Sequence, residues 1–185
     1  MSTSFSPRFS IIIPSYNRAD ELAELLGSLE RLQFPRDQFE VIVSDDGSTD
    51  ATAQLVQDFI QHAKLNLVYL TQENKGPGAA RNHGLEKARG DFFIFIDSDV
   101  TMPDTWLQNI AKTVEVEQCA AFGGPDTYRE DFSAILKAIN YSMTSFITTG
   151  GLRGKKGTKL AKFYPRSFNM GLSRSLWQQI GGFGS

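Results

Sequence analysis

The chain has a single cysteine, Cys119, among its 185 residues, so no disulfide can form within it. Cys119 lies in an apolar stretch, and we interpret it as a packing residue. Low cysteine usage is typical of a reducing compartment, so we expect the protein in the cytoplasm or at the cytoplasmic face of a membrane. No apolar run reaches the roughly 18 residues that a membrane-spanning helix needs. Residues 1–8 form a polar tail without the apolar core of a signal peptide.

Two familiar phosphate-binding signatures are also absent. The Gly-x-x-x-x-Gly-Lys-Ser/Thr pattern does not occur, so the chain is not a P-loop enzyme. The first apolar run is followed by Pro14, Ser15, Tyr16 and Asn17 rather than by a glycine-rich turn, which disfavours a dinucleotide dehydrogenase. A signalling receiver domain is disfavoured as well, because its acidic pair should follow the first strand. A nucleotide, if one binds, must be held in another way.

Acidic residues are missing from the last third of the chain. Residues 1–131 hold 11 Lys/Arg and 21 Asp/Glu, a net charge of −10, whereas residues 132–185 hold 8 Lys/Arg and no acid, a net charge of +8. The basic segment 153–166 either faces an anionic substrate or is a solvated loop. It lacks the interleaved aromatic residues of single-strand binders, so we expect no nucleic-acid partner.

Apolar runs alternate with helical patterns along the chain. The sequence predicts strands at residues 9–13, 39–44, 66–70, 92–96 and 119–122, and helices at 18–32, 51–63, 78–88 and from Pro103 onward. Such alternation predicts an α/β fold with parallel βαβ units and helices on both faces of the sheet. Beyond residue 131 we expect a helix at 131–148, a loop at 149–162, a short strand at 168–172 and a helix at 174–180. Residues 9–185 then form one domain.

Carboxylates follow two of the predicted strands. Asp97 and Asp99 come directly after the run 92–96, and Asp45 and Asp46 follow the run 39–44. Residues two apart on an extended backbone point the same way, so Asp97 and Asp99 repel each other unless a cation joins them. Oxygen ligands suit Mg²⁺ or Mn²⁺, although the two residues could also be solvated in a polar loop. Arg81, at the start of a predicted helix, can pair with a phosphate or with a neighbouring carboxylate.

Four ordered segments resemble the family 2 glycosyltransferases. They are residues 10–17 (SIIIPSYN), 41–50 (VIVSDDGSTD), 74–82 (NKGPGAARN) and 95–99 (FIDSD), and the likeness covers about residues 9–183. The resemblance implies a GT-A fold, which is Rossmann-like with a mostly parallel sheet. It implies that residues 9–124 bind the nucleotide sugar and that 125–185 lie on the acceptor side. The implied reaction moves a sugar with inversion from a nucleotide-diphosphate donor, with UDP favoured, to a hydroxyl of a carbohydrate or lipid-linked acceptor.

The resemblance also implies roles for single residues. The implied substrate- or nucleotide-binding residues are Pro14, Ser15, Tyr16, Asp45, Asp46, Arg81, Asp97, Ser98 and Asn169, of which Asn169 borders the donor sugar and the acceptor. Among these, Asp46 accepts from the imide of a uracil-like base. Asp97 and Asp99 form the metal motif for Mg²⁺ or Mn²⁺, and we expect Asp99 to coordinate directly. The metal offsets the charge that grows on the departing diphosphate.

An inverting transfer needs a general base, and the family usually places a carboxylate after a Gly-Gly-Phe segment. Here Gly181, Gly182 and Phe183 are followed only by Gly184 and Ser185. We expect the usual base to lie past residue 185, as would any membrane contact, so this chain alone can lack activity. Asp126 is a candidate substitute catalytic residue within the chain, and it could equally act as a cap or bind the sugar. The alternative is a non-catalytic domain that binds a nucleotide sugar.

Overall fold

The computed structural model describes residues 6–123 and 169–183. Its centre is a sheet of six strands in the order β3-β2-β1-β4-β6-β5. The strands are β1 (Phe9–Ser15), β2 (Phe39–Asp45), β3 (Leu67–Thr71), β4 (Phe92–Phe95), β5 (Ala121–Gly123) and β6 (Met170–Ser173). β1 pairs in parallel with both β2 and β4, and β2 pairs in parallel with β3. The predicted mostly parallel α/β sheet is confirmed.

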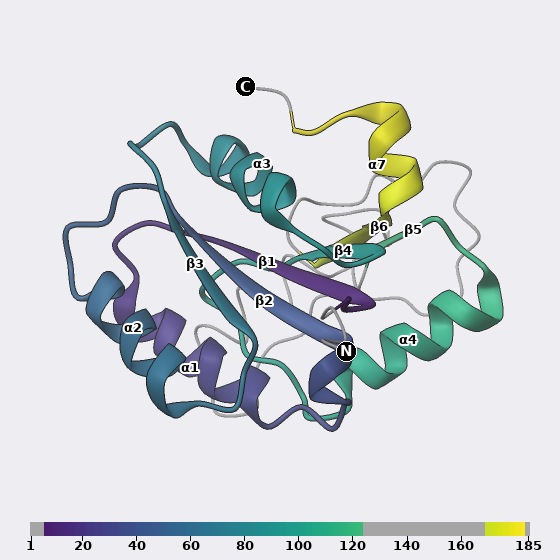
Figure 1. The fold of residues 1–185 in the computed structure, drawn as a ribbon, viewed down its shortest axis with the longest axis horizontal. Helices are drawn as coiled ribbons and strands as arrows, with labels where there is room; N and C mark the ends of the chain where they lie inside the picture. Colours follow the sequence, from purple (N-terminus) through teal and green to yellow (C-terminus); the bar gives the residue numbers. More distant parts are fainter. Residues whose placement is uncertain (1–5, 124–168, 184–185) are drawn as a thin grey trace, which may run out of the picture.

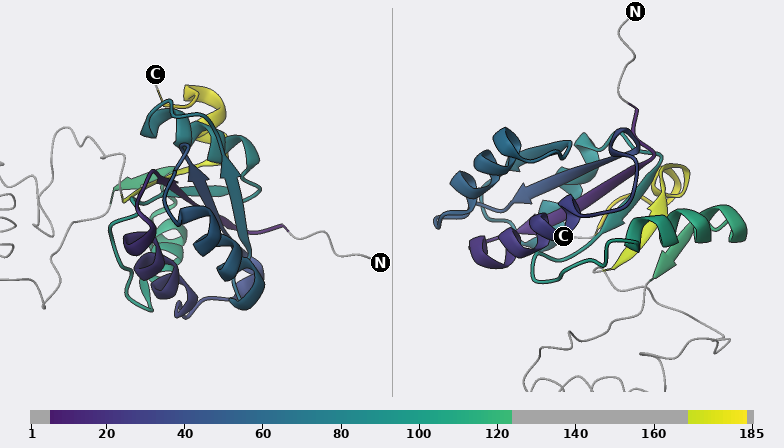
Figure 2. Two further views of the ribbon diagram at one scale, coloured as in Figure 1. Left: turned by 90° about the vertical axis from the view of Figure 1, so that its left-hand side faces the viewer. Right: turned by 90° about the horizontal axis from the view of Figure 1, so that it is seen from below.

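Helices cover both faces of this sheet (Figures 1 and 2). The helices are α1 (Ala19–Glu30), α2 (Thr52–His62), α3 (Pro77–Lys87), α4 (Trp106–Glu117) and α7 (Arg174–Ile180), with a 3₁₀ turn, η1, at Arg36–Gln38. Alternation along β1 explains the two layers. Ile11 and Ile13 face the core that α1, α2 and α4 cover, whereas Ile12 faces the core that α3 and α7 cover.

Close packing of α3 on β1 depends on a glycine. A Cβ atom at Gly84 would lie 2.6 Å from Cγ2 of Ile12, so the helix can approach the strand this closely only without a side chain there. The first residues of α3 thereby sit over the central strands of the sheet. α3 carries Arg81 and Asn82, so this packing fixes where both side chains lie relative to the sheet.

β6 enters the sheet antiparallel to both of its neighbours, β4 and β5. Phe95 of β4 pairs with Met170 of β6, which in turn pairs with Gly123 of β5. The start of β6 and the end of β5 therefore lie beside the carboxyl end of β4. Segments 120 and 170 residues into the chain meet the acidic motif at one edge of the sheet.

Element boundaries differ from the sequence predictions at a few places. The helix expected from Pro103 begins at Trp106, because residues 103–105 form a turn in which the Trp106 N–H donates to the Pro103 carbonyl at 2.9 Å. The short strand predicted at 168–172 runs over Met170–Ser173. The helix predicted at 131–148 and the loop predicted at 149–162 lie outside the described residues.

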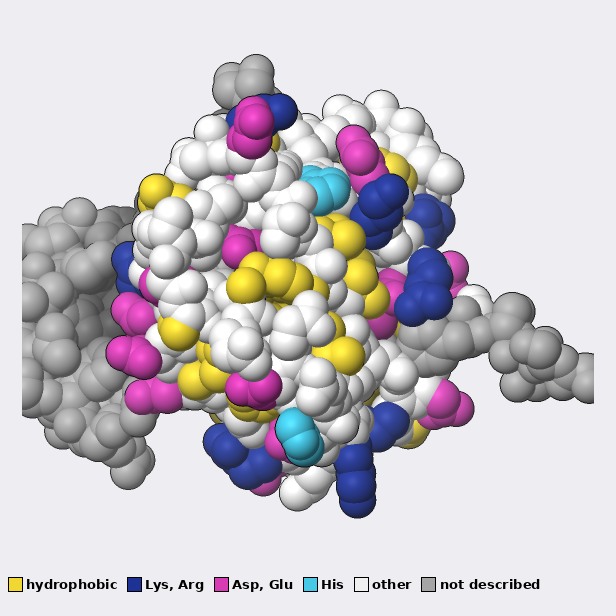
Figure 3. Space-filling model, turned by 60° about the vertical axis from the view of Figure 1, so that its left-hand side comes forward, with side chains coloured by type: hydrophobic (Ala, Val, Ile, Leu, Met, Phe, Trp, Pro, Cys, Tyr) yellow, Lys and Arg dark blue, Asp and Glu magenta, His cyan; other side chains and the backbone are white. Residues whose placement is uncertain are grey.

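The edge strand β3 leaves its side chains partly exposed. On the face that Figure 3 brings forward, hydrophobic side chains lie together near the middle, with charged side chains around them.

Among the helices that the structure describes, none is long and apolar enough to cross a membrane.

Candidate functional site

The loops after β1, β2 and β4 meet at the carboxyl edge of the sheet. Ser15 and Asp45, the last residues of β1 and β2, are paired in register, and the Asp46 N–H donates to the Ser15 carbonyl at 2.9 Å. On the other side of β1, the Ile96 N–H donates to the Ile12 carbonyl at 3.2 Å, which directs the chain toward Asp97. Ligands of open α/β sheets bind at this edge. The structure therefore brings together the two acidic motifs that the sequence separates by some fifty residues.

Asp45 builds the turn that follows β2. Its Oδ1 accepts from the Ser48 N–H at 3.0 Å and from the Ser48 hydroxyl at 2.5 Å, and its Oδ2 accepts from the Tyr69 hydroxyl at 2.5 Å. The carboxylate is buried and has partners on both oxygens. Burial, this hydrogen bond and the negative charges of Asp45 and Asp50 raise the pKa of Tyr69. The observed role of Asp45 is to hold the turn, and its contact with a nucleotide stays a prediction.

Asp46 organises the loop that leads into α3. Its Oδ1 accepts from the Gln72 side-chain amide at 2.7 Å and from the Lys75 N–H at 2.9 Å, and its Oδ2 accepts from the Gly76 N–H at 2.8 Å. A carboxylate has about four lone-pair positions, so three are used and one on Oδ2 remains. That position could accept one further N–H donor, and its contact with a base stays a prediction.

The loops after β1 and β2 are tied to each other. Asn17, in the left-handed region at φ 49°, donates its N–H to the Ser48 hydroxyl at 2.8 Å, and its Oδ1 accepts the Thr49 N–H at 2.8 Å. Pro14 and Ser15 are buried at the end of β1. Tyr16, the next residue, is 47% exposed, so its ring is accessible at this edge of the sheet.

Asp50 holds the first turns of two helices. Its Oδ1 accepts the Thr52 N–H of α2 at 3.0 Å, and its Oδ2 accepts the Ala19 N–H of α1 at 3.1 Å. Burial acts to raise the pKa of Asp50, but hydrogen bonds from Thr52 and Ala19 outweigh it and lower that pKa. Asp50 therefore binds backbone N–H groups at the start of both α1 and α2.

Arg81 and the acidic motif after β4 form the second half of the site. Nη2 of Arg81 lies 2.6 Å from Oδ1 of Asp97, so of the two partners expected for this arginine, the structure shows the carboxylate. Asp99 is more loosely held: its Oδ2 lies 3.6 Å from Nη1 of Arg18, and its side chain is 52% exposed. Asp99 is therefore the more exposed carboxylate of the two, while Asp97 is engaged by Arg81, and direct coordination of a metal by Asp99 stays a prediction. Ser98 is buried between them.

The donor set fits a hard divalent cation that brings its own further ligands. Among the described residues, no group of three or more His, Cys, Asp or Glu side chains is placed to hold a metal. Mg²⁺ and Mn²⁺ at phosphate-transfer sites commonly use one or two carboxylates together with phosphate oxygens and water. Asp97 and Asp99 suit that pattern, because they are two carboxylates at a solvent-exposed edge beside an arginine.

Asn169 lies at the same edge, one residue before the Met170–Phe95 pair, and it adopts φ 54°. The predicted catalytic residue Asp126, the basic segment 153–166 and residues 184–185 lie outside the described residues.

Two residues near the site were not predicted from the sequence to take part in it. Gln72 donates to Asp46, and Asn82 is bonded to the backbone of Phe183. No spacing in the sequence points to either contact, because each joins segments that only the fold brings together.

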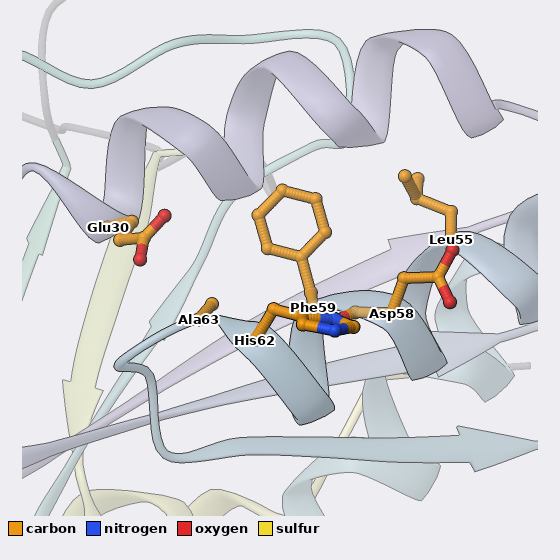
Figure 4. Close-up of a pocket in the computed structure, with 6 residues that line it drawn as sticks. All are labelled: Glu30, Leu55, Asp58, Phe59, His62 and Ala63. Carbon is orange, nitrogen blue, oxygen red and sulfur yellow. The ribbon is translucent and has the colours of Figure 1, made fainter.

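A separate hollow of about 260 Å³ lies between α1 and α2, toward the amino ends of the strands (Figure 4). It is lined by Glu30, Leu55, Asp58, Phe59, His62 and Ala63. Because α1 and α2 run away from the carboxyl edge of the sheet, this hollow is not part of the site that the acidic motifs form.

Comparison with known proteins places this geometry in context. The model of the family described as glycosyl transferase family 2 matches residues 10–180. Poly(ribitol-phosphate) beta-N-acetylglucosaminyltransferase TarS of Staphylococcus aureus is 39% identical over 108 residues, which are 58% of this chain and 19% of TarS.

Solved structures agree with this match. TarS 1-349 in complex with UDP-GlcNAc is similar with a TM-score of 0.62 and 35% identity, over 69% of this chain and 36% of that one. The mannosyltransferase PcManGT of Pyrobaculum calidifontis, in complex with GDP-Man and Mn²⁺, is similar with a TM-score of 0.76 and 26% identity, over 98% of this chain and 48% of that one. The chain spans less than half the length of each of these proteins.

Proposed function

The chain belongs to glycosyl transferase family 2, and from this premise we propose that it forms the donor-binding part of an enzyme that moves a sugar from a nucleoside-diphosphate sugar to an acceptor hydroxyl. The observation that carries the proposal is the meeting of Asp46, Arg81 and the Asp97/Asp99 pair at one edge of the sheet. Binding of such a donor requires a group that recognises the base and further groups that hold the diphosphate. In this proposal Asp46 recognises the base, and Asp97, Asp99 and Arg81 hold the diphosphate through a bound metal ion and a positive charge.

On the base side, the free lone pair of Asp46 supports recognition of an imide N–H. Pro14, Ser15 and Tyr16 line the same pocket in this proposal, and the exposed ring of Tyr16 offers a stacking face. Uracil and guanine both present such an N–H, and the similar structures contain UDP-GlcNAc or GDP-Man. We favour UDP, because the likeness to TarS has the higher identity of the two.

On the diphosphate side, Asp99 with Asp97 would hold Mg²⁺ or Mn²⁺, and the bound ion would supply Lewis-acid stabilisation of the departing diphosphate. PcManGT binds Mn²⁺ together with GDP-Man, which supports this assignment. Arg81 adds a fixed positive charge beside Asp97. Arg18 would leave Asp99 when the ion arrives, because its 3.6 Å contact is long and exposed.

Transfer with inversion further requires a base on the acceptor side. We propose residues 9–124 as the donor-binding part and 125–185 as the start of the acceptor side, with Asn169 bordering the sugar. The acceptor in this proposal is a carbohydrate or a lipid-linked glycan at the cytoplasmic face of a membrane, and its base is either Asp126 or a carboxylate outside this sequence. Residues 132–185 hold no Asp or Glu, and this observation favours the second candidate, a domain that binds a nucleotide sugar without catalysis.

Single-turnover assays separate the two candidates. Radiolabelled UDP-GlcNAc, UDP-glucose and GDP-mannose are each offered with Mn²⁺ and with a poly(ribitol phosphate) or glycan acceptor to this chain and to the native polypeptide that contains it. Sugar appearing on an acceptor supports the transferase. Donor binding without transfer by either protein supports the binding domain, and absence of donor binding contradicts both.

A further inference from the structure

We propose that Asn82 is a positioning residue for the donor site: its side-chain amide clamps the backbone of Phe183, whose ring then holds the Arg81 guanidinium against Asp97. The proposal rests on the proposed function, because Arg81 and Asp97 matter to a ligand only if a nucleotide diphosphate binds beside them. It assigns to the Gly181–Phe183 segment a role in the donor site.

The clamp is a reciprocal pair of hydrogen bonds between one side chain and one residue of backbone. Nδ2 of Asn82 donates to the Phe183 carbonyl at 2.9 Å, and the Phe183 N–H donates to Oδ1 of Asn82 at 2.8 Å. Only an amide side chain offers a donor and an acceptor side by side, so neither an aspartate nor an aliphatic residue can replace it. The two residues are 101 positions apart, so this contact pins a distant segment onto α3.

The residue before Phe183 must be small for this contact to form. A Cβ atom at Gly182 would collide with Oδ1 of Asn82. Gly181, at φ 80°, turns the chain out of α7 toward α3 in a conformation that other residues adopt at a cost. The two glycines therefore allow the backbone at 182–183 to approach the amide directly.

The clamp places the ring of Phe183 over the arginine. Cζ of Arg81 lies 5.7 Å from the ring centroid, within the range of a cation–π contact. The same ring meets Phe95 edge-on, with centroids 5.0 Å apart, and Phe95 precedes Asp97 by two residues. The ring thus contacts both α3 and the strand that leads into the acidic motif.

The consequence is a guanidinium with little freedom. The Arg81 side chain is 8% exposed, and its Nε is buried with no partner among the described residues. Exclusion of water strengthens the charge pair between Nη2 of Arg81 and Oδ1 of Asp97. Without the ring, solvent would reach the guanidinium and Arg81 could leave Asp97. The clamp accordingly fixes both charges before any diphosphate arrives.

The test opens the clamp from each of its two sides in the full 185-residue chain. Asn82→Ala removes the amide, and Gly182→Ala pushes the backbone away from it. The matched control is Asn66→Ala, because Asn66 also donates its amide to backbone carbonyls, those of Arg36 and Phe39, but at the far end of the sheet. The probe is UDP with Mn²⁺, followed by calorimetry.

We expect UDP affinity in Mn²⁺ to fall about tenfold in Asn82→Ala and Gly182→Ala, the effect of loosening one charge-assisted contact. Asn66→Ala should bind UDP with the wild-type affinity, even if its thermal stability falls as much as that of the two clamp variants. Wild-type affinity in both clamp variants would overturn the proposal.

A ligand-free readout keeps this test separate from the proposed function. Hydrogen exchange at the Phe183 amide and at Nε–H of Arg81 is followed by NMR without nucleotide. Both signals should exchange faster in Asn82→Ala, whereas Phe183→Leu should keep the amide of residue 183 protected and release only Nε–H of Arg81. Unchanged exchange in Asn82→Ala overturns the clamp. Faster exchange in a chain whose wild type binds no nucleotide supports the clamp and contradicts the proposed function.

Discussion

Arg81 and Asp97 form an ion pair whose two partners differ in exposure. Nη2 of Arg81 and Oδ1 of Asp97 are 2.6 Å apart, yet the arginine side chain is 8% exposed and the aspartate side chain 36%. The aspartate therefore stands at the boundary between the protein interior and solvent, with the arginine behind it. Such a pair can present a carboxylate edge to a ligand while its geometry stays fixed by a buried partner.

Removal of Asp97 and removal of Asp99 should affect stability differently. Asp97→Ala leaves the Arg81 charge buried without its partner, and we expect a loss of about 1–2 kcal/mol, below the cost of breaking a fully buried pair because Asp97 is partly solvated. Asp99→Ala removes only an exposed contact and should change stability by less than about 0.5 kcal/mol. Urea unfolding measures both. Equal losses in the two variants would contradict the different roles assigned to them.

Asp46 should be important for stability even without a ligand. Asp46→Ala removes the acceptor for Gln72, Lys75 and Gly76, and we expect a loss of about 2–4 kcal/mol because hydrogen bonds to a buried carboxylate are lost together. Hydrogen exchange should also quicken at the amides of Lys75 and Gly76. The exposed Asp91→Ala is the control. A variant as stable as that control would show that the loop 72–76 does not depend on Asp46.

The hydroxyl of Tyr69 makes a pH-dependent contribution to the free energy of unfolding. The sign of this contribution follows from the raised pKa of Tyr69. The folded protein resists ionising the hydroxyl, so this contribution is complete below the ordinary tyrosine pKa of about 10 and is lost as the pH rises toward the folded value. Tyr69→Phe should be less stable than the wild type at pH 8 by about 1–3 kcal/mol, because Asp45 loses a partner. The difference in the free energy of unfolding between the wild type and Tyr69→Phe, measured in urea, should become smaller between pH 10 and 11.5. A difference that stays constant over that range would contradict the assignment.

Two helical glycines should respond oppositely to alanine. Gly84→Ala places a methyl group 2.6 Å from Ile12 and should cost about 1–3 kcal/mol by forcing α3 away from β1. Gly27→Ala in α1 meets nothing closer than a side-chain nitrogen of Arg31 at 3.9 Å and should stabilise by about 0.5–1 kcal/mol through helix propensity. Thermal unfolding of both variants measures the difference. A neutral Gly84→Ala would show that the α3–β1 contact is looser than described.

Much of the fold could be predicted because its strands are long apolar runs. Residues 92–96 are apolar throughout, and residues 39–44 are apolar apart from Glu40 and Ser44, a composition typical of buried parallel strands. The helix predicted near 174–180 is confirmed as α7, and the structure shows it capped by the Ser173 hydroxyl, which accepts from the Leu176 N–H. By contrast, the antiparallel insertion of β6 between β4 and β5 has no local signal, since only long-range pairing decides it.

The candidate site could be predicted in its residues but not in its contacts. Asp46, Arg81, Asp97 and Asp99 stood out by motif, whereas the partner of Arg81 was left open until Asp97 was found beside it. The role of Asn82 could not be anticipated, because an amide that binds backbone a hundred residues away leaves no periodicity or spacing in the sequence. Asp126, the catalytic residue suggested within this chain, lies outside the described residues and stays a prediction.

Calorimetric titration of UDP into the wild type and into Asp99→Ala, each with and without Mn²⁺, tests the central claim most directly. The account predicts binding by the wild type that strengthens at least about tenfold with Mn²⁺ and loses this gain in Asp99→Ala. The variant should remain folded, so the loss reports on the site. UDP binding that is equal with and without Mn²⁺, or equal in the two proteins, would contradict the assignment of Asp97 and Asp99 as the metal-holding part of a nucleotide-sugar site.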